Sequence, residues 1–441
     1  MKKLLLLLFV ANLIPFMARA SVGDSFDYNG ITYTVIDETD KTCFVGSIDF
    51  ESNSGVSGDI IIPSSVPYNG SQYTVTVIGS FAFSYCTSLT SITLPSTLTA
   101  IYSHAFENCK SLTEIFIPKR VNHIDSNSFI NCMSLTAINV DMGNDNYVSI
   151  NGVLFSKDMT ILIEFPGGKS GDYIIPAGVK SIEEEAFSYC KNLTSISLPD
   201  GITSIGMSAF SDCTNLTSIS LPEGLTSIEA GVFSHCTNLT SVSLPESITE
   251  INFFAFRECT NLSSINIPEN ITLIGGLAFD GCYSITEISL PKGITAIEFR
   301  TFSNCTGLNK VSLPENIMAI DEQAFVNCFS LSIVNSYATT PPECYNDDVF
   351  AGIPSDAVLH VPVGTKNAYA TAIGWSIFSN IIDDLNPIMG VKEIETSSKD
   401  ADDSVMVYNL QGLRMGASNR SELPSLPSGI YIIGGRKVLV K

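Results

Sequence analysis

Hydrophobic and polar positions alternate along this 441-residue chain in a pattern that returns with a fixed period. The recurring unit reads Ala-Phe-x-x-Cys-x-x-Leu-x-x-Ile-x-Leu-Pro, and its Phe stands at Phe83, Phe106, Phe129, Phe187, Phe210, Phe233, Phe256, Phe279, Phe302 and Phe325. Neighbouring Phe residues are 23 positions apart, except that 58 positions separate Phe129 from Phe187. This period is typical of solenoids, in which each coil buries its apolar side only against neighbouring coils.

Each unit predicts one short strand followed by a turn. In the segment 193–199, Ile196 and Leu198 point inward, Ser195 and Ser197 point outward, and Pro199 ends the strand because proline has no N–H for a ladder. Coils stacked at the ~4.8 Å spacing of strands bring successive Phe rings within stacking range. We therefore expect the Phe column to be core.

Cysteine follows the same period, and ten of the twelve Cys residues stand three positions after a repeat Phe. Equivalent Cβ atoms in neighbouring coils lie ~4.8 Å apart, which is wider than the ~3.5–4.5 Å of a disulfide. We expect buried free thiols that act as small apolar side chains. Cys43 and Cys344 belong to opposite ends of the stack, too far apart to pair with each other.

The pattern divides the chain into six parts. Residues 1–20 carry Lys2 and Lys3, an apolar run and Ala18-Arg19-Ala20, the features of a cleavable signal peptide. Residues 21–70 form an N-terminal cap, and 71–335 form the repeats. Residues 336–385 form a C-terminal cap anchored by Trp375, 386–403 a linker, and 404–441 a small β appendage.

The long interval between Phe129 and Phe187 contains an irregular insertion at about 139–176. Asn151-Gly152 predicts a hairpin turn within the segment 147–155, and we expect the insertion to bulge from the coil. In the appendage, strands are expected at 405–410, 429–433 and 437–440, with Gly434-Gly435 as a turn.

The repeat motifs resemble the BspA-like (Treponema pallidum-type) leucine-rich repeat family, whose coils carry the same L-x-x-I-x-L-P and A-F-x-x-C signatures. The resemblance implies a mainly β fold with few short helical turns: a right-handed leucine-rich repeat solenoid of 23-residue coils with two caps. The segments 407–412, 426–431 and 437–441 resemble the C-terminal sorting domain read by the type IX secretion system of Bacteroidetes. A β appendage that only stabilises the C-terminus is the alternative.

Candidate chemistry is sparse, so the sequence predicts no enzyme, no cofactor and no metal site. The four His residues fall at different phases of the repeat or in the cap, so no column brings two together. The segment 141–146 is rich in Asp and Asn, but the sixth and twelfth positions of an EF-hand loop would be Asn146 and Gly152. A solvated turn is therefore favoured over calcium.

The surface is the remaining candidate for function. A formal net charge of −22 makes nucleic acid and anionic lipid poor partners, and no run after the leader is long enough to span a membrane. The outward strand positions form a tentative ligand-binding surface, which consists of Ser195, Ser197, Ser218, Ser220, Ser241, Ser243, Ser264, Asn266, Glu287, Ser289, Lys310 and Ser312.

The family resemblance implies an exported cell-surface or secreted binding protein. We expect an adhesin that binds a host matrix protein, a glycan or another bacterium, and that meets the secretion machinery through its tail. The alternative is a structural, self-associating surface protein without a specific host ligand.

Overall fold

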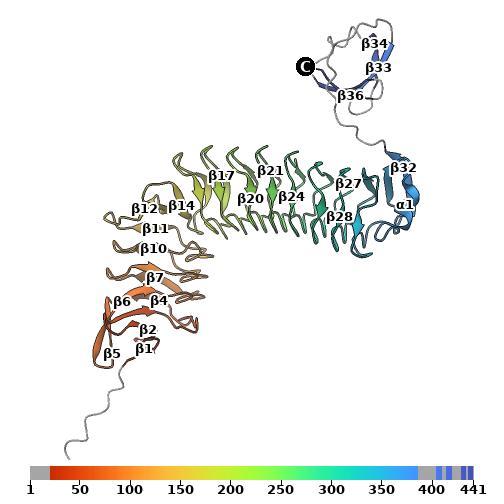
Figure 1. Ribbon diagram of the computed structural model, residues 1–441. Helices are drawn as coiled ribbons and strands as arrows, with labels where there is room; N and C mark the ends of the chain where they lie inside the picture. The colour runs from red at the N-terminus through yellow and green to blue at the C-terminus, as the bar shows by residue number, and fades with distance from the viewer. Residues whose placement is uncertain (1–19, 386–403, 410–413, 420–428, 434–435, 441) are drawn as a thin grey trace, which may run out of the picture.

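The computed structural model describes residues 20–385, 404–409, 414–419, 429–433 and 436–440. This part is nearly all strand, and its single helix is α1 (Lys366–Thr371). The 23-residue segments form about 13 turns of a β-solenoid with a pronounced bend (Figure 1). The predicted solenoid architecture is confirmed.

Two series of parallel strands run along the solenoid, and we call the side that carries the longer ones the strand face. Its strands are β4 (Gly58–Ile61), β7 (Leu89–Thr93), β9 (Glu114–Ile117), β11 (Ala137–Val140), β15 (Gly171–Ile174), β17 (Leu193–Ser197), β19 (Ser218–Ser220), β21 (Ser241–Ser243), β23 (Ser264–Ile265), β25 (Glu287–Ser289), β27 (Lys310–Leu313), β29 (Ile333–Ser336), β31 (Val358–Pro362) and β32 (Asn380–Leu385).

The second series consists of two-residue strands, one per coil, that follow the Pro of the repeat. They are β8 (Ala100–Ile101), β10 (His123–Ile124), β16 (Ser181–Ile182), β18 (Ser204–Ile205), β20 (Ser227–Ile228), β22 (Glu250–Ile251), β24 (Leu273–Ile274), β26 (Ala296–Ile297), β28 (Ala319–Ile320) and β30 (Glu343–Cys344). The Ala-Phe-x-x-Cys segments then close each coil, and we call the side that they form the turn side.

The Phe column is the centre of the core, as the sequence predicts. Repeat Phe rings that are neighbours in the stack lie with centroids 5.0–5.7 Å apart and nearly parallel planes. Two rings outside the regular spacing join the column: Phe165 stacks on Phe187 and Phe350 stacks on Phe325. The column ends at Trp375, which is fully buried and donates from Nε1 to the Pro342 carbonyl at 2.9 Å.

The Cys column lies beside the rings, and all twelve thiols are free and buried. In most coils the Sγ donates to the carbonyl of the repeat Phe in the preceding coil, at 3.0–3.2 Å. The thiol thus has a directional partner as well as an apolar environment. The expectation of free thiols is confirmed, and the hydrogen bond explains why a sulfhydryl occupies this position.

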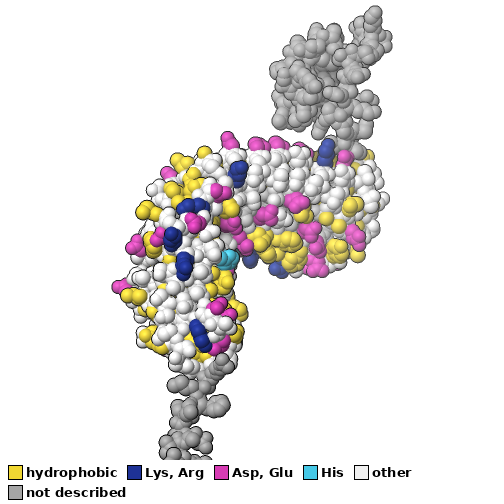
Figure 2. Space-filling view, turned by 60° about the vertical axis from the view of Figure 1, so that its left-hand side comes forward, with side chains coloured by type: hydrophobic (Ala, Val, Ile, Leu, Met, Phe, Trp, Pro, Cys, Tyr) yellow, Lys and Arg dark blue, Asp and Glu magenta, His cyan; other side chains and the backbone are white. Residues whose placement is uncertain are grey.

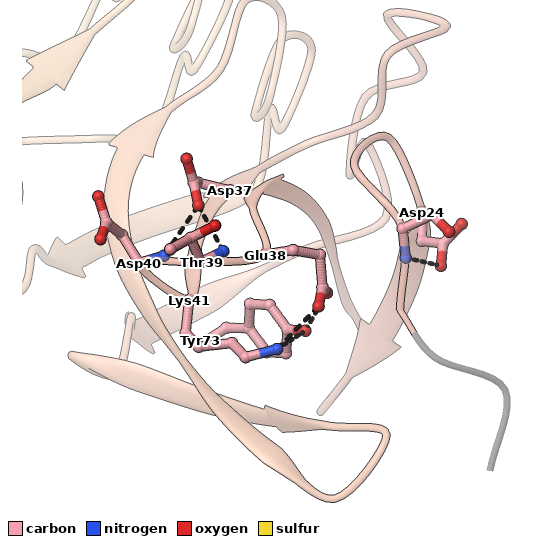
Figure 3. Close-up of polar contacts among 8 residues, drawn as sticks. Asp24, Asp37, Glu38, Thr39, Asp40, Lys41 and Tyr73 are labelled. Atoms are coloured by element: carbon pink, nitrogen blue, oxygen red, sulfur yellow. Dashed lines mark hydrogen bonds and ion pairs between the residues drawn. The ribbon is translucent and has the colours of Figure 1, made fainter.

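The N-terminal cap covers the first coil with mainly antiparallel strands: β1 (Ser25–Tyr28), β2 (Ile31–Asp37), β3 (Thr42–Val45), β5 (Ser65–Tyr68) and β6 (Ser71–Ile78). A polar contact ties the β2–β3 turn to β6: Glu38 accepts from the Tyr73 hydroxyl and from Lys41 Nζ (Figure 3). In the same turn, Asp37 Oδ1 accepts from the backbone N–H groups of Thr39 and Asp40.

The insertion does not bulge outward, contrary to the sequence-based expectation. Its strands β12 (Tyr147–Ile150), β13 (Val153–Ser156) and β14 (Ile161–Glu164) lie within the stack at the bend (Figure 1). Val153, Phe155 and Leu162 pack into the core that continues to the C-terminal cap, whereas Leu154 and Ile163 pack into the core of the N-terminal coils. Alternating side chains therefore make this hairpin a wall between two hydrophobic cores.

After the wall, the chain restarts the solenoid with a motif that the N-terminal cap also uses. Segments 57–63 and 170–176 both read Ser-Gly-Asp-x-Ile-Ile-Pro, and each supplies a strand that pairs in parallel with the first full strand after it, β7 or β17. Gly58 and Gly171 have φ of +73° and +88°, a conformation that glycine adopts without strain. The insertion is thus a second, internal cap.

The bend closes toward the turn side because the insertion adds little there. A Cβ built on Gly167 would lie 3.2 Å from the Cys132 carbonyl oxygen and 3.9 Å from that of Tyr189, so one glycine separates the two flanking coils. Elsewhere around the coil the insertion is wider: β12 and β13 contact β11 of the strand face, and β14 pairs in parallel with β16 of the second series. The Phe column breaks at the same place, since among the described residues no ring contact joins Phe129 to Phe165.

The C-terminal appendage contains four antiparallel strands in the order β34-β33-β35-β36. Their bounds are β33 (Ser404–Asn409), β34 (Arg414–Asn419), β35 (Gly429–Ile433) and β36 (Arg436–Val440). Strands therefore occupy the described residues of all three predicted runs, Leu410 lies outside them, and β34 is a strand that the sequence analysis missed. The predicted Gly434-Gly435 turn lies outside the described residues.

We expect Phe210→Ala to lower the free energy of unfolding by about 3–5 kcal/mol, because the fully buried ring leaves a cavity between two neighbouring rings. Urea denaturation followed by circular dichroism measures this change. Phe116→Ala is the matched control, because Phe116 is 52% exposed on the strand face and should change stability by only about 0.5 kcal/mol. Equal losses in the two variants would contradict the core role of the column.

Candidate binding surface

The structure places the predicted serine rows on the strand face, in register from coil to coil. Ser218 pairs with Ser241 and Ser241 with Ser264, while Ser220 pairs with Ser243. Farther along, Glu287 pairs with Lys310 and Ser289 with Ser312. Side chains that are 23 residues apart in sequence are thus direct neighbours on one surface.

Polar contacts within the surface occupy its two ends. Near the bend, Ser195 Oγ donates to Asp172 Oδ1 at 2.6 Å, and Lys310 Nζ forms a 2.6 Å ion pair with Glu287 in the later coils. Between these ends, Ser218, Ser220, Ser241 and Ser243 are exposed, and no described residue forms a hydrogen bond with their hydroxyls. The middle of the surface therefore offers the most free hydrogen-bonding groups.

Two aspartates that the sequence analysis did not single out organise the start of the strand face on either side of the bend. Asp59 accepts hydrogen bonds from Ser91 and Thr90, and Asp172 accepts them from Ser195 and Thr194. These hydroxyl donors lower the pKa of both carboxyl groups. The repeated Ser-Gly-Asp motif could have identified these residues from the sequence. An Asp at the same position of two caps indicates that both accept the same kind of hydrogen bond from the following strand.

Carboxylates from both sides of the bend gather on the turn side. Glu183, Glu184 and Glu185 follow the wall, and Glu107 comes from a coil before it. Burial, together with Glu184 and Glu107, raises the pKa of Glu185 to about 6. Acidic side chains and a histidine are visible at the inner corner of the bend (Figure 2).

Unpaired polar atoms are concentrated at this corner. Within the part of the chain that the structure describes, the buried side-chain atoms without a hydrogen-bond partner are His104 Nδ1, Asn127 Oδ1, Asn131 Oδ1 and Glu185 Oε2. Asn127, Asn131 and Glu185 belong to the two coils that flank the wall, and His104 belongs to the coil before them, where its Nδ1 lies 3.4 Å from Glu107 Oε2. They mark the place where neighbouring coils no longer supply regular partners.

Glu164 is the most buried acid of the bend, with 5% of its surface exposed at the end of β14. Burial, and then the charge of Glu185, raises its pKa well above the usual value. Its charge in turn contributes to the raised pKa of the Cys132 and Cys190 thiols. No cluster of three or more His, Cys, Asp or Glu among the described residues has the arrangement of a metal site.

The repeats match a family profile described as "BspA type Leucine rich repeat region", with six copies over residues 64–173, 165–286 and 232–349. The chain belongs to the BspA-type leucine-rich repeat family. No curated protein matches the chain.

Solved structures of bacterial leucine-rich repeat proteins resemble this chain. A leucine-rich repeat protein from Bacteroides ovatus is 24% identical, with a TM-score of 0.47, 81% of this chain covered and 88% of that one. The pneumococcal vaccine antigen PcpA is 20% identical, with a TM-score of 0.42 and 83% and 100% covered. A leucine-rich cell surface protein from Faecalibacterium prausnitzii is 22% identical, with a TM-score of 0.35 and 81% and 94% covered.

We expect Glu164→Gln to stabilise the protein at pH 8 relative to the native chain and to flatten the dependence of stability on pH. A carboxyl whose pKa is raised on folding binds a proton more tightly in the folded state, so stability falls as the pH rises above the unfolded value of about 4.5. Glutamine is neutral at every pH, so the variant does not lose this stability as the pH rises.

Urea denaturation at pH 5 and pH 8 measures the effect, and Glu223→Gln, on an exposed loop, is the matched control. If Glu164→Gln were no more stabilising at pH 8 than at pH 5, the buried carboxyl would not titrate as the structure indicates.

Proposed function

We propose that this chain is an exported cell-surface protein that binds a protein or glycan of a host or of another bacterium through the middle of the strand face. The observation that carries the proposal is the in-register array of exposed hydroxyls on consecutive rungs, from Ser218 and Ser220 to Ser241 and Ser243. An extended sheet of this kind can hold a large partner by many weak polar contacts.

Membership of the BspA-type family supports a binding role, because proteins of this kind are typically binding or structural proteins and not enzymes. In the described part of the chain, no helix has the length and apolar character needed to cross a membrane. The leader on which export depends lies, apart from Ala20, outside the described residues.

The alternative function is structural: acidic solenoids that associate with one another and coat the cell surface. Exposed apolar side chains on the two restarting strands favour this alternative, because Ile61 of β4 and Ile174 of β15 are 74% and 76% exposed. A concentration-dependent increase in molecular mass, without capture of any host molecule, would favour it over adhesion.

Replacing Ser218, Ser220, Ser241 and Ser243 by Lys should abolish capture of matrix proteins or glycans on an array, while the melting curve stays unchanged. The four side chains point away from the core, and long charged side chains there block close approach to the sheet. The control variant carries four Lys directly before the strands of the second series, at the exposed positions Thr203, Thr226, Thr249 and Thr272. Capture that survives in the first variant would remove the strand face from the proposal.

We also propose that residues 404–441 direct export, as the resemblance of the tail to type IX sorting domains implies. The solenoid is closed by its own cap at Trp375, so deleting the tail should leave the melting curve unchanged. In a bacterium with type IX machinery, protease accessibility on intact cells should show loss of the truncated chain from the surface. Normal display of the truncated protein would contradict the sorting role.

A further inference from the structure

A notch interrupts the turn side between two coils that follow the bend. Three consecutive coils carry Met207-Ser208, Ala230-Gly231 and Phe253-Phe254 at the same two positions of the repeat. The middle pair is much smaller than the pairs on either side, and a hollow of about 300 Å³ lies there. Met207 and Phe254, which line it, are 47% and 38% exposed.

The notch results from side-chain size and not from a gap in the backbone. Ser208 N–H donates to the Ala230 carbonyl at 2.9 Å, and Gly231 N–H donates to the Phe253 carbonyl at 2.9 Å, so the coils keep their normal spacing. A Cβ added to Gly231 would lie 2.9 Å from Ser208 Oγ, so this hydroxyl forms part of the bottom of the notch. The notch is thus present in a part of the solenoid whose backbone pairing is regular.

The two ends of the notch carry opposite charges. The positive charge has an ion-pair partner, whereas the negative charge has none among the described residues. At one end, the Arg257 guanidinium lies 5.7 Å from the centre of the Phe254 ring, and its Nε is 3.4 Å from Asp280 Oδ2. At the other end, Glu184 forms no ion pair with any described residue. Its neighbours in sequence are Glu183 and Glu185, whose raised pKa values reflect burial and the charge of Glu184. This end therefore has uncompensated negative charge.

We propose that this notch binds a lysine or arginine side chain of a partner protein. The aliphatic stem of such a side chain fits between Met207 and Phe254, and its charged end meets Glu184. Both ammonium and guanidinium groups only donate hydrogen bonds, which suits the carboxylates at this end. The site lies on the turn side, so it is separate from the strand face and extends the proposed function to a basic protein segment.

The test uses fluorescence anisotropy of the full chain with a labelled hexalysine peptide, and the fully acetylated peptide as a charge-free probe. Glu184→Gln should weaken hexalysine binding by about fivefold. Glu322→Gln is the matched control, because Glu322 occupies the same position of the repeat in a coil beyond the notch. Glu322→Gln should leave the affinity for hexalysine within about a factor of 1.5 of the affinity of the native chain. Equal weakening in the two variants would overturn the proposal, because the attraction would then be general.

A second variant tests the shape of the site. Ala230→Phe gives the middle coil the aromatic residue that the next coil carries as Phe253, and it should fill the notch without entering the core. We expect the same loss of hexalysine binding with an unchanged melting curve. If the Phe variant melts early, Ala230→Met replaces it, because the preceding coil already carries Met207 at this position.

Unchanged binding in a folded, filled variant would overturn the proposal, as would equal affinity for acetylated and free peptide. The native chain could instead capture a neutral glycan and not hexalysine, with the capture abolished by Ala230→Phe. That result would identify a sugar site and would also overturn the proposal. The four-Lys variant of the strand face should still bind hexalysine at the notch. Failure of the notch proposal can therefore be distinguished from failure of the strand-face proposal.

Discussion

Each regular coil of this protein contains one Phe ring and one Cys thiol, and in most coils their partners belong to the neighbouring coil. The ring stacks 5.0–5.7 Å from the next ring, and the thiol donates to the carbonyl of the preceding repeat Phe. A 23-residue coil is too small to bury an apolar core by itself, so its stability depends on these contacts with its neighbours.

The same dependence explains why an interruption needs a cap. At the bend, the hairpin of β13 and β14 closes one core with Leu154 and Ile163 and opens the other with Val153, Phe155 and Leu162. A second Ser-Gly-Asp-x-Ile-Ile-Pro strand then restarts the strand face. The buried Glu164 and the unpaired atoms nearby are the local cost of joining two stacks.

The two long surfaces differ because the core constrains them differently. On the strand face, side chains alternate with core residues, and small hydroxyls recur in register from rung to rung. On the turn side, the two positions before the buried Ala-Phe or Val-Phe pair carry little of the packing, so they vary from Met207 to Ala230 to Phe253. The uniform surface suits an extended partner, whereas the varied one can form a local notch.

The period alone determined the solenoid, the inward and outward strand positions, the Phe column and the buried free thiols, because these features depend on neighbours one period away. The tertiary structure alone decided that the insertion lies inside the stack, and that Phe165 and Phe350 join the column. It also decided that Glu164 is buried where its charge acts on the Cys132 and Cys190 thiols, and that Ala230 lies at a notch. Where the repeat is broken or its side chains change size, the period no longer specifies which atoms meet, and three-dimensional packing decides instead.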